Sequence, residues 1–183
     1  MFESRPPQYL FKHEKQAVHI ANIYETKNFV VEAVEKPHID RNDGGHIKIT
    51  PKVRLVDRQQ LSPTQAIELM RLTIVVGQAM TKAMREHGVD IGRINYQDNG
   101  NWSVFKTEGP YLHIHLYGRA KSAKIQKYGQ ACYFPNVGEK PEYYEKLKPL
   151  TEEDVKGIRA EIEKLLKEEK FSDFAWGLNK LER

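Results

Sequence analysis

The chain has very little cysteine: Cys132 is the only one among 183 residues. One cysteine cannot form an internal disulfide, and it cannot supply the paired cysteines of many structural zinc sites. The sequence also lacks a run of 18 apolar residues, so it predicts no transmembrane helix. The first residues lack the apolar core of a signal peptide. We therefore expect a cytoplasmic protein without a membrane partner.

An excess of charge of one sign is also missing. The 29 basic and 25 acidic residues leave a net charge of +4 that is spread along the chain. This charge suits an anionic small ligand but is too weak to indicate nucleic-acid binding. The length fits one domain with short extensions. We expect an N-terminal arm over residues 1–19, a domain over residues 20–170 and a C-terminal tail over residues 171–183.

Alternating apolar and polar residues predict several strands. The expected strands cover residues 28–35, 46–50, 93–97 and a segment around 111–117. We also expect a short helix within residues 12–26, and we expect residues 101–109 to continue a hairpin from the third strand.

The clearest helix follows Ser62, which is a good N-cap, with Pro63 at the first helical position and Gln65 completing a capping box. Gly88 is a plausible stop. The centre of this helix is apolar on more than one face. We expect the sheet to cover one face and a partner subunit to cover another, which predicts a homodimer.

A C-terminal helix is predicted from Thr151, because Thr151 and Asp154 form an N-terminal box ahead of an apolar stripe. Strands, helix, strands and helix therefore follow one another along the chain. This order favours an α+β fold with a mainly antiparallel sheet, one long central helix and a C-terminal helix.

The segment PYLHIHLYGRAK, residues 110–121, carries two histidines in an otherwise apolar strand. Side chains alternate in a strand, so one face would hold Tyr111, His113, His115 and Tyr117. Three readings are open for this face. It could be a solvent-exposed sheet face that happens to hold two histidines. It could be a metal site completed by other histidines, or it could hold a nucleophilic imidazole.

Three stretches in this order, GGHIKITPK, INYQDNG and HIHLYGR, resemble the histidine triad (HIT) superfamily of nucleotide hydrolases and transferases. The resemblance covers roughly residues 20–165. The family carries three alternating histidines on one strand and a further histidine in an upstream Gly-His strand. Here Tyr111 stands where the family has its first strand histidine. His113 matches the central one, the nucleophile, His115 matches the third, and His46 matches the upstream histidine.

The resemblance implies that His113 attacks the α-phosphorus of a nucleoside phosphate and forms a nucleotidyl-histidine. Its other ring nitrogen gives its proton to an acceptor, which is a backbone carbonyl in the family. His115 and His46 would donate hydrogen bonds to phosphate oxygens, where charge accumulates. No cofactor is implied and no metal is required. A phenol at position 111 can hydrogen-bond but cannot easily exchange a proton near pH 7.

Further nucleotide contacts are suggested by the same resemblance. The expected nucleotide-binding residues are Glu35, Gln97, Asn99, Thr107, Tyr111 and Arg119. Gln97 and Asn99 also have an ordinary reading as turn residues, and Arg119 as a solvated side chain. The base would lie against apolar side chains, for which Phe29, Val31 and Ile49 are candidates, although each could equally belong to the core.

These residues predict a hydrolase of nucleoside phosphates, acting on dinucleoside polyphosphates or nucleoside phosphoramidates. A nucleotidyltransferase using the same intermediate is one alternative. A nucleotide-binding protein without catalysis is a second, because Tyr111 replaces a family histidine. A zinc-binding variant is a third, with ligands drawn from His38, His46, His113 and His115.

Overall fold

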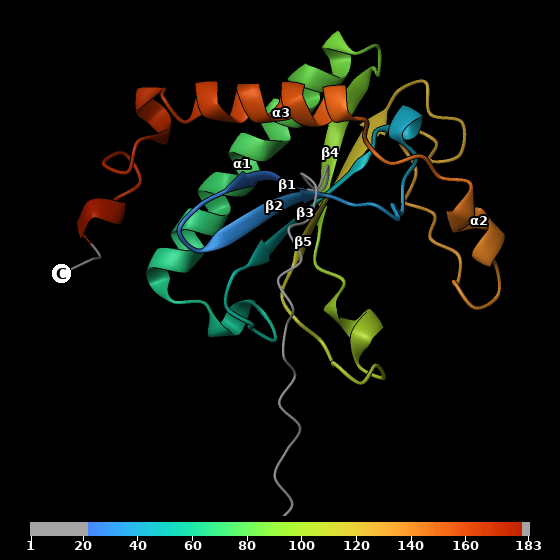
Figure 1. Ribbon diagram of the computed structural model, residues 1–183, viewed down its shortest axis with the longest axis horizontal. Coiled ribbons are helices and arrows are strands. Elements are labelled where there is room, and N and C mark those ends of the chain that lie inside the picture. The colour runs from blue at the N-terminus through green and yellow to red at the C-terminus, as the bar shows by residue number, and fades with distance from the viewer. Residues whose placement is uncertain (1–21, 181–183) are drawn as a thin grey trace, which may run out of the picture.

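A computed structural model describes residues 22–180 (Figure 1). Its centre is a five-stranded antiparallel sheet with the strand order β1-β2-β3-β5-β4. The strands are β1 (Asn22–Glu25), β2 (Phe29–Ala33), β3 (His46–Pro51), β4 (Ile91–Gln97) and β5 (Ile114–Ala120). The sheet and its helices confirm the expected α+β fold. The predicted arm, residues 1–19, lies outside the described residues.

Two local expectations were wrong. Asn22–Glu25 is a strand and not part of a helix, and the remainder of residues 12–21 lies outside the described part of the chain. Residues 101–109 do not continue the hairpin from β4. They form a 3-10 turn (Gly100–Ser103) and further turns, because Gly109 has φ +65° and Pro110 cannot donate to a ladder. This connection leads back to β5.

The long helix α1 (Pro63–Glu86) has the predicted capping box. The Gln65 amide donates to Ser62 Oγ over 3.2 Å, and the Ser62 amide donates to Gln65 Oε1 over 3.0 Å. Gly88, just beyond the helix, takes the left-handed conformation with φ +81° that a stop residue needs. The helix packs on the apolar face of the sheet, opposite the histidines.

The second apolar face of α1 is covered largely by α3 (Glu152–Leu165), which also reaches β1 (Figure 1). Val155, Ile158 and Ile162 of α3 are buried in the shared core. Part of the surface that the sequence assigned to a partner subunit is therefore covered by the chain itself. Phe171, in the predicted tail, also packs into this core.

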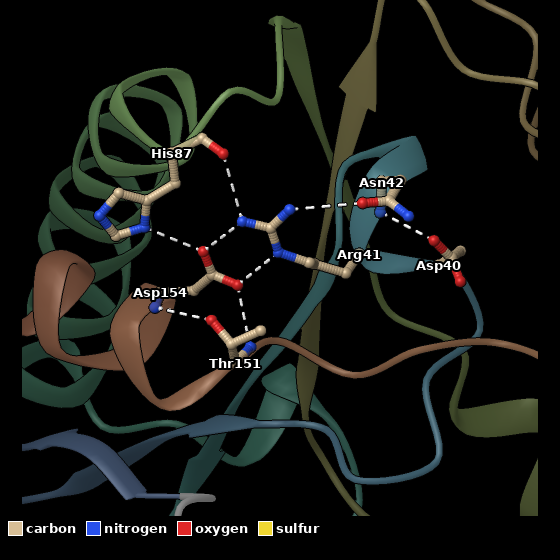
Figure 2. A network of polar contacts seen from close by, with 6 residues as sticks. All are labelled: Asp40, Arg41, Asn42, His87, Thr151 and Asp154. Carbon is tan, nitrogen blue, oxygen red and sulfur yellow. Dashed lines mark hydrogen bonds and ion pairs between the residues drawn. The ribbon is translucent and has the colours of Figure 1, made fainter.

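A buried carboxylate ties α3 to the rest of the molecule (Figure 2). Asp154 accepts two hydrogen bonds from the Arg41 guanidinium, at 2.7 and 2.8 Å, and one from His87 Nδ1 at 2.9 Å. It also accepts the Thr151 amide at 2.9 Å. Burial alone would raise the pKa of Asp154, but these hydrogen bonds, with Arg41 foremost, hold it below its ordinary value.

The loop from residue 34 to 45 lies directly against β5. A Cβ added to Gly118 would lie 2.1 Å from the Gly44 carbonyl oxygen, so the two backbones approach too closely for any side chain at Gly118. Gly44 itself has φ +135°. The close approach brings His38 and His46 over the face of β5 that carries the other histidines.

Candidate active site

The four alternating side chains of residues 110–121 share one face, as the sequence predicts. Adjacent ring centroids are 4.5 Å apart for Tyr111–His113, 4.5 Å for His113–His115 and 5.3 Å for His115–Tyr117. The face is not open to solvent, because His113 is only 7% exposed and His115 only 4%. The reading as a solvent-exposed sheet face is therefore wrong.

A cavity of about 370 Å³ lies between this face and the connection that precedes it. Such a volume is within the range of small-molecule sites. Its walls come from β3, from the loop before β3, and from the connection between β4 and β5. The lining residues are Val34, His38, His46, Lys48, Asn99, Trp102, Ser103, Lys106, Glu108, Gly109, Tyr111, His113 and His115.

The protonation of the nucleophile candidate follows from its one backbone partner. His113 Nδ1 lies 2.9 Å from the carbonyl oxygen of Tyr111. A carbonyl only accepts, so Nδ1 carries the proton. Burial lowers the pKa of His113, so at neutral pH the ring is uncharged and Nε2 holds a free lone pair. That nitrogen has the lone pair that a nucleophile needs, and its ring lines the cavity.

The protonation of His115 is set by a chain that begins at a backbone amide. The amide of His38 donates to His46 Nδ1 over 3.1 Å, so the proton of neutral His46 is on Nε2. His46 Nε2 lies 2.8 Å from His115 Nδ1 and donates to it. The proton of His115 is then on Nε2, which is the ring nitrogen left for a ligand. Burial lowers the pKa of His46 and takes that of His115 to about 3, so both rings are neutral at pH 7.

A second buried group completes this network. Tyr117 is fully buried, and its hydroxyl lies 2.8 Å from His38 Nδ1. Asn99 Nδ2 donates to the same hydroxyl over 3.3 Å. Asn99 is thus joined to the histidines through Tyr117. The strand pattern had placed Tyr117 on this face, but nothing local indicated that His38 would meet it.

Nitrogen atoms of His38, His46 and His115 lie within 4.8 Å of one another, which is close enough to consider a metal site. The hydrogen bonds oppose it. A neutral imidazole has one lone pair, and that of His46 accepts the His38 amide. The nitrogen of His46 that faces His115 carries a proton and cannot bind a metal. The His38 amide and the rings of His46 and His115 therefore form a proton-ordered chain, which argues against the zinc-binding alternative.

Residues 122–132 are held by two buried charges, Asp43 and Arg119. The Asp43 carboxylate accepts the amides of Lys124, Ile125 and Gln126 at 2.8 to 2.9 Å. Arg119 donates to the carbonyls of residues 126, 127 and 130 and to Cys132 Sγ. Arg119 is thus a buried anchor outside the cavity lining, which corrects the expectation that it contacts the nucleotide.

Just beyond that segment, Phe134 reaches the histidine chain. Its ring centroid lies 5.7 Å from His38, 5.8 Å from Trp102 and 5.1 Å from Tyr117. The anchored segment therefore adds an aromatic wall beside the histidines.

The structure divides the predicted site residues into two groups. Those that line the cavity are His46, Asn99, Tyr111, His113 and His115. Those that do not are Glu35, Gln97, Thr107 and Arg119. Glu35 and Thr107 are exposed in connections, and Gln97 pairs with His115 in the backbone ladder. The base-pocket candidates Phe29, Val31 and Ile49 are fully buried core residues.

Sequence reasoning missed the lining residues Lys48, Trp102 and Lys106. The alternation of HIKIT put Lys48 on the face of His46, so its position could have been predicted. Trp102 and Lys106 lie in the connection between β4 and β5, which was expected to form a strand, so no face could be assigned to them.

Comparison with known proteins gives structural matches only. No family model matches the chain, and no curated protein matches its sequence. A hypothetical histidine triad nucleotide-binding protein from Sulfolobus tokodaii is 20% identical, with a TM-score of 0.53 over 84% of this chain and 89% of the other. A HIT-like protein from Bartonella henselae is 16% identical, with a TM-score of 0.50 over 77% and 85%. At such identities the likeness shows the fold alone, and the chain has the fold of histidine triad proteins.

Proposed function

We propose that the chain is a nucleotide-binding hydrolase of the histidine triad type, acting on nucleoside phosphates through a nucleotidyl-histidine. One observation carries the proposal. His113 Nδ1 is committed to the Tyr111 carbonyl, which leaves Nε2 unprotonated beside the N–H of His115 in a cavity of suitable size. An uncharged, oriented imidazole next to a neutral N–H donor is what attack on a phosphate requires.

In the first step, His113 Nε2 forms a bond to the α-phosphorus, and the bond from phosphorus to the leaving group breaks. The leaving group departs with the bonding electrons. The imidazole becomes positively charged, and its Nδ1–H remains on the Tyr111 carbonyl, which stabilises that charge. His115 Nε2–H donates to the phosphate oxygens as charge builds on them.

In the second step, water attacks the phosphorus and releases a proton to solvent, and the bond from phosphorus to Nε2 breaks. The products are a nucleoside monophosphate and the neutral His113 ring. Lys48 and Lys106 supply positive charge at the cavity wall for the phosphate groups. Asn99 holds Tyr117, and through it His38, in place behind the histidine chain.

The test is to trap the intermediate. The purified chain is mixed with dinucleoside polyphosphates or nucleoside phosphoramidates and examined by denaturing mass spectrometry. We expect an adduct of one nucleoside monophosphate less water, located on His113 by peptide mapping and absent from His113→Ala. An adduct on another residue, or turnover without His113, would contradict the mechanism.

The same experiment separates hydrolysis from transfer. Products are compared with and without inorganic phosphate or a sugar phosphate as acceptor. We expect the monophosphate in both cases, whereas a nucleotidyltransferase would give a new nucleotide only with the acceptor. Tight monophosphate binding without turnover of any substrate would instead indicate a non-catalytic nucleotide-binding protein.

A further inference from the structure

The carbonyl of Tyr111 has to point at His113, yet the sheet does not hold it there. β5 begins at Ile114, and its pairing with β3 ends with Ile49 opposite Ile114. Residues 111–113 precede the ladder. Some other part of the chain must orient the acceptor that fixes the nucleophile.

The segment that follows β3 supplies the first constraint. The amide of Leu112 donates to the carbonyl of Leu55 over 2.7 Å. The Leu112 N–H and the Tyr111 C=O belong to the same planar, trans peptide unit, so they point in opposite directions. Holding the N–H on Leu55 therefore aims the C=O away from Leu55, and that C=O accepts His113 Nδ1–H.

The neighbouring residue, Arg54, supplies the second constraint. Its guanidinium donates to the carbonyl of Glu108 and, over 3.3 Å, to the carbonyl of Pro110. These two carbonyls flank Gly109, which has φ +65°. Arg54 thus holds a flexible turn, and with it the peptide plane just before Tyr111.

Arg54 also touches Tyr111 itself. The guanidinium carbon lies 5.7 Å from the centre of the Tyr111 ring, within cation–π range. The other neighbour of that ring is His113, with centroids 4.5 Å apart and planes 30° apart. Among residues 22–180 the Tyr111 hydroxyl makes no hydrogen bond. The contacts of Tyr111 are those of its ring and its backbone.

We propose that Arg54 and the ring of Tyr111 form a positioning pair that replaces the first strand histidine of this fold and holds the nucleophile His113. The pair acts through the ring face and not through the phenol hydroxyl. This inference rests on the proposed function, because it assigns a role toward the nucleophile of the same site. Neither side chain reacts with substrate.

The kinetic test uses single and paired variants of the full chain. We expect Arg54→Ala and Tyr111→Leu each to lower kcat about tenfold, which is the scale of one hydrogen bond plus one cation–π contact. KM should change little. Tyr111→Phe keeps the ring and should lower kcat much less than Tyr111→Leu does. Because the two side chains act as one unit, the double variant should be little worse than either single variant.

Two controls sharpen the kinetic result. Lys52→Ala removes a positive charge from the same segment and should leave kcat unchanged. Arg54→Lys keeps the charge but replaces the planar guanidinium beside the Tyr111 ring with a compact ammonium, so it should restore kcat only in part. Additive losses in the double variant, or a Tyr111→Phe variant as slow as Tyr111→Leu, would overturn the pair.

A spectroscopic readout separates this inference from the proposed function. Nitrogen NMR of labelled histidine reports which ring nitrogen carries the proton. We expect His113 to be fixed as the Nδ1–H form, to become a mixture of both forms in Arg54→Ala and Tyr111→Leu, and to remain fixed in Tyr111→Phe. An unchanged spectrum in Arg54→Ala refutes the positioning role whether or not the chain is a hydrolase. Turnover that survives in His113→Ala refutes the proposed function. The spectra then test the positioning role of Arg54 and Tyr111 on their own.

Discussion

His113 differs from an ordinary strand histidine in having one ring nitrogen fixed by a backbone carbonyl and the other free. Replacing it removes the proposed nucleophile. We expect His113→Ala and His113→Asn to lower kcat on the order of 10³-fold or more, as for loss of a covalent nucleophile. Because the residue is buried and not exposed, some loss of stability is expected too, and thermal unfolding should be measured beside the rate. Near-full activity in His113→Ala with none in His115→Ala would move the nucleophile to His115.

The pH dependence of the reaction should also depend on a single residue, His113. Burial lowers the pKa of His113 below 6.5, so protonation should remove the nucleophile only at more acid pH. We expect kcat/KM to stay level as the pH falls from 8 to 6.5, and to decline below that. A pH–rate profile from pH 4 to 8 measures this. A decline already centred above pH 6.5 would show that the ring is stabilised in its charged form.

Among the elements, α3 depends on one carboxylate for its attachment. Asp154 is fully buried and is bonded to Arg41, His87 and the start of its own helix (Figure 2). Asp154→Asn removes the fully buried carboxylate charge that pairs with the partly buried Arg41 guanidinium, so we expect a loss of about 3 kcal/mol in the free energy of unfolding. Glu161→Gln, also in α3, breaks an ion pair with exposed Lys82 of α1 and should cost far less. Denaturant unfolding of both variants compares them.

The Asp154 carboxylate should also affect how the free energy of unfolding changes in acid. Its pKa in the folded chain is lower than in the unfolded chain, so the unfolded chain binds the extra proton first as the pH falls. The stability contributed by Asp154 is complete above about pH 4, near the ordinary value, and is lost progressively below it. We expect Asp154→Asn to show a shallower loss of stability than the unmodified chain between pH 4 and pH 2. Parallel curves for the two would contradict this assignment.

For the whole molecule, one apolar surface stays uncovered by the described chain. Met70 is 57% exposed and Tyr96 is 49% exposed, and both border a cavity of about 510 Å³ that Leu61 and Ile74 also line. β4 lies beside this surface as an edge strand of the sheet. Unpaired edges and apolar patches invite association, and closed twofold dimers are the commonest assembly. We therefore retain the prediction of a homodimer, through one face of α1 and the β4 edge of the sheet.

Sedimentation at micromolar concentration tests the dimer. We expect Met70→Lys to shift the chain toward monomer, because it places a charge in the apolar contact. Val53→Lys, at a position 64% exposed outside this surface, is the matched control and should leave the assembly unchanged. A monomeric unmodified chain would contradict the prediction.

The sequence by itself determined what depends on neighbours in the chain. Capping boxes at Ser62 and Thr151 set where two helices begin, because both partners lie within four residues. Alternation placed His113 and His115 on one face, because side chains in a strand have a period of two. Within the connection between β4 and β5, the sequence wrongly predicted a strand. That segment has no periodic pattern, and its glycine and proline favour turns.

Only the tertiary structure decided which nitrogen of each histidine carries a proton. That choice depends on groups brought from elsewhere: the His38 amide to His46, and His46 in turn to His115, 69 residues further along the chain. The same holds for Arg54, which reaches carbonyls more than fifty residues away, and for Arg119, which the fold buries as an anchor. An imidazole or a guanidinium is the same chemical group at every position in a sequence. What it donates to, and whether water reaches it, is fixed only when distant segments pack around it.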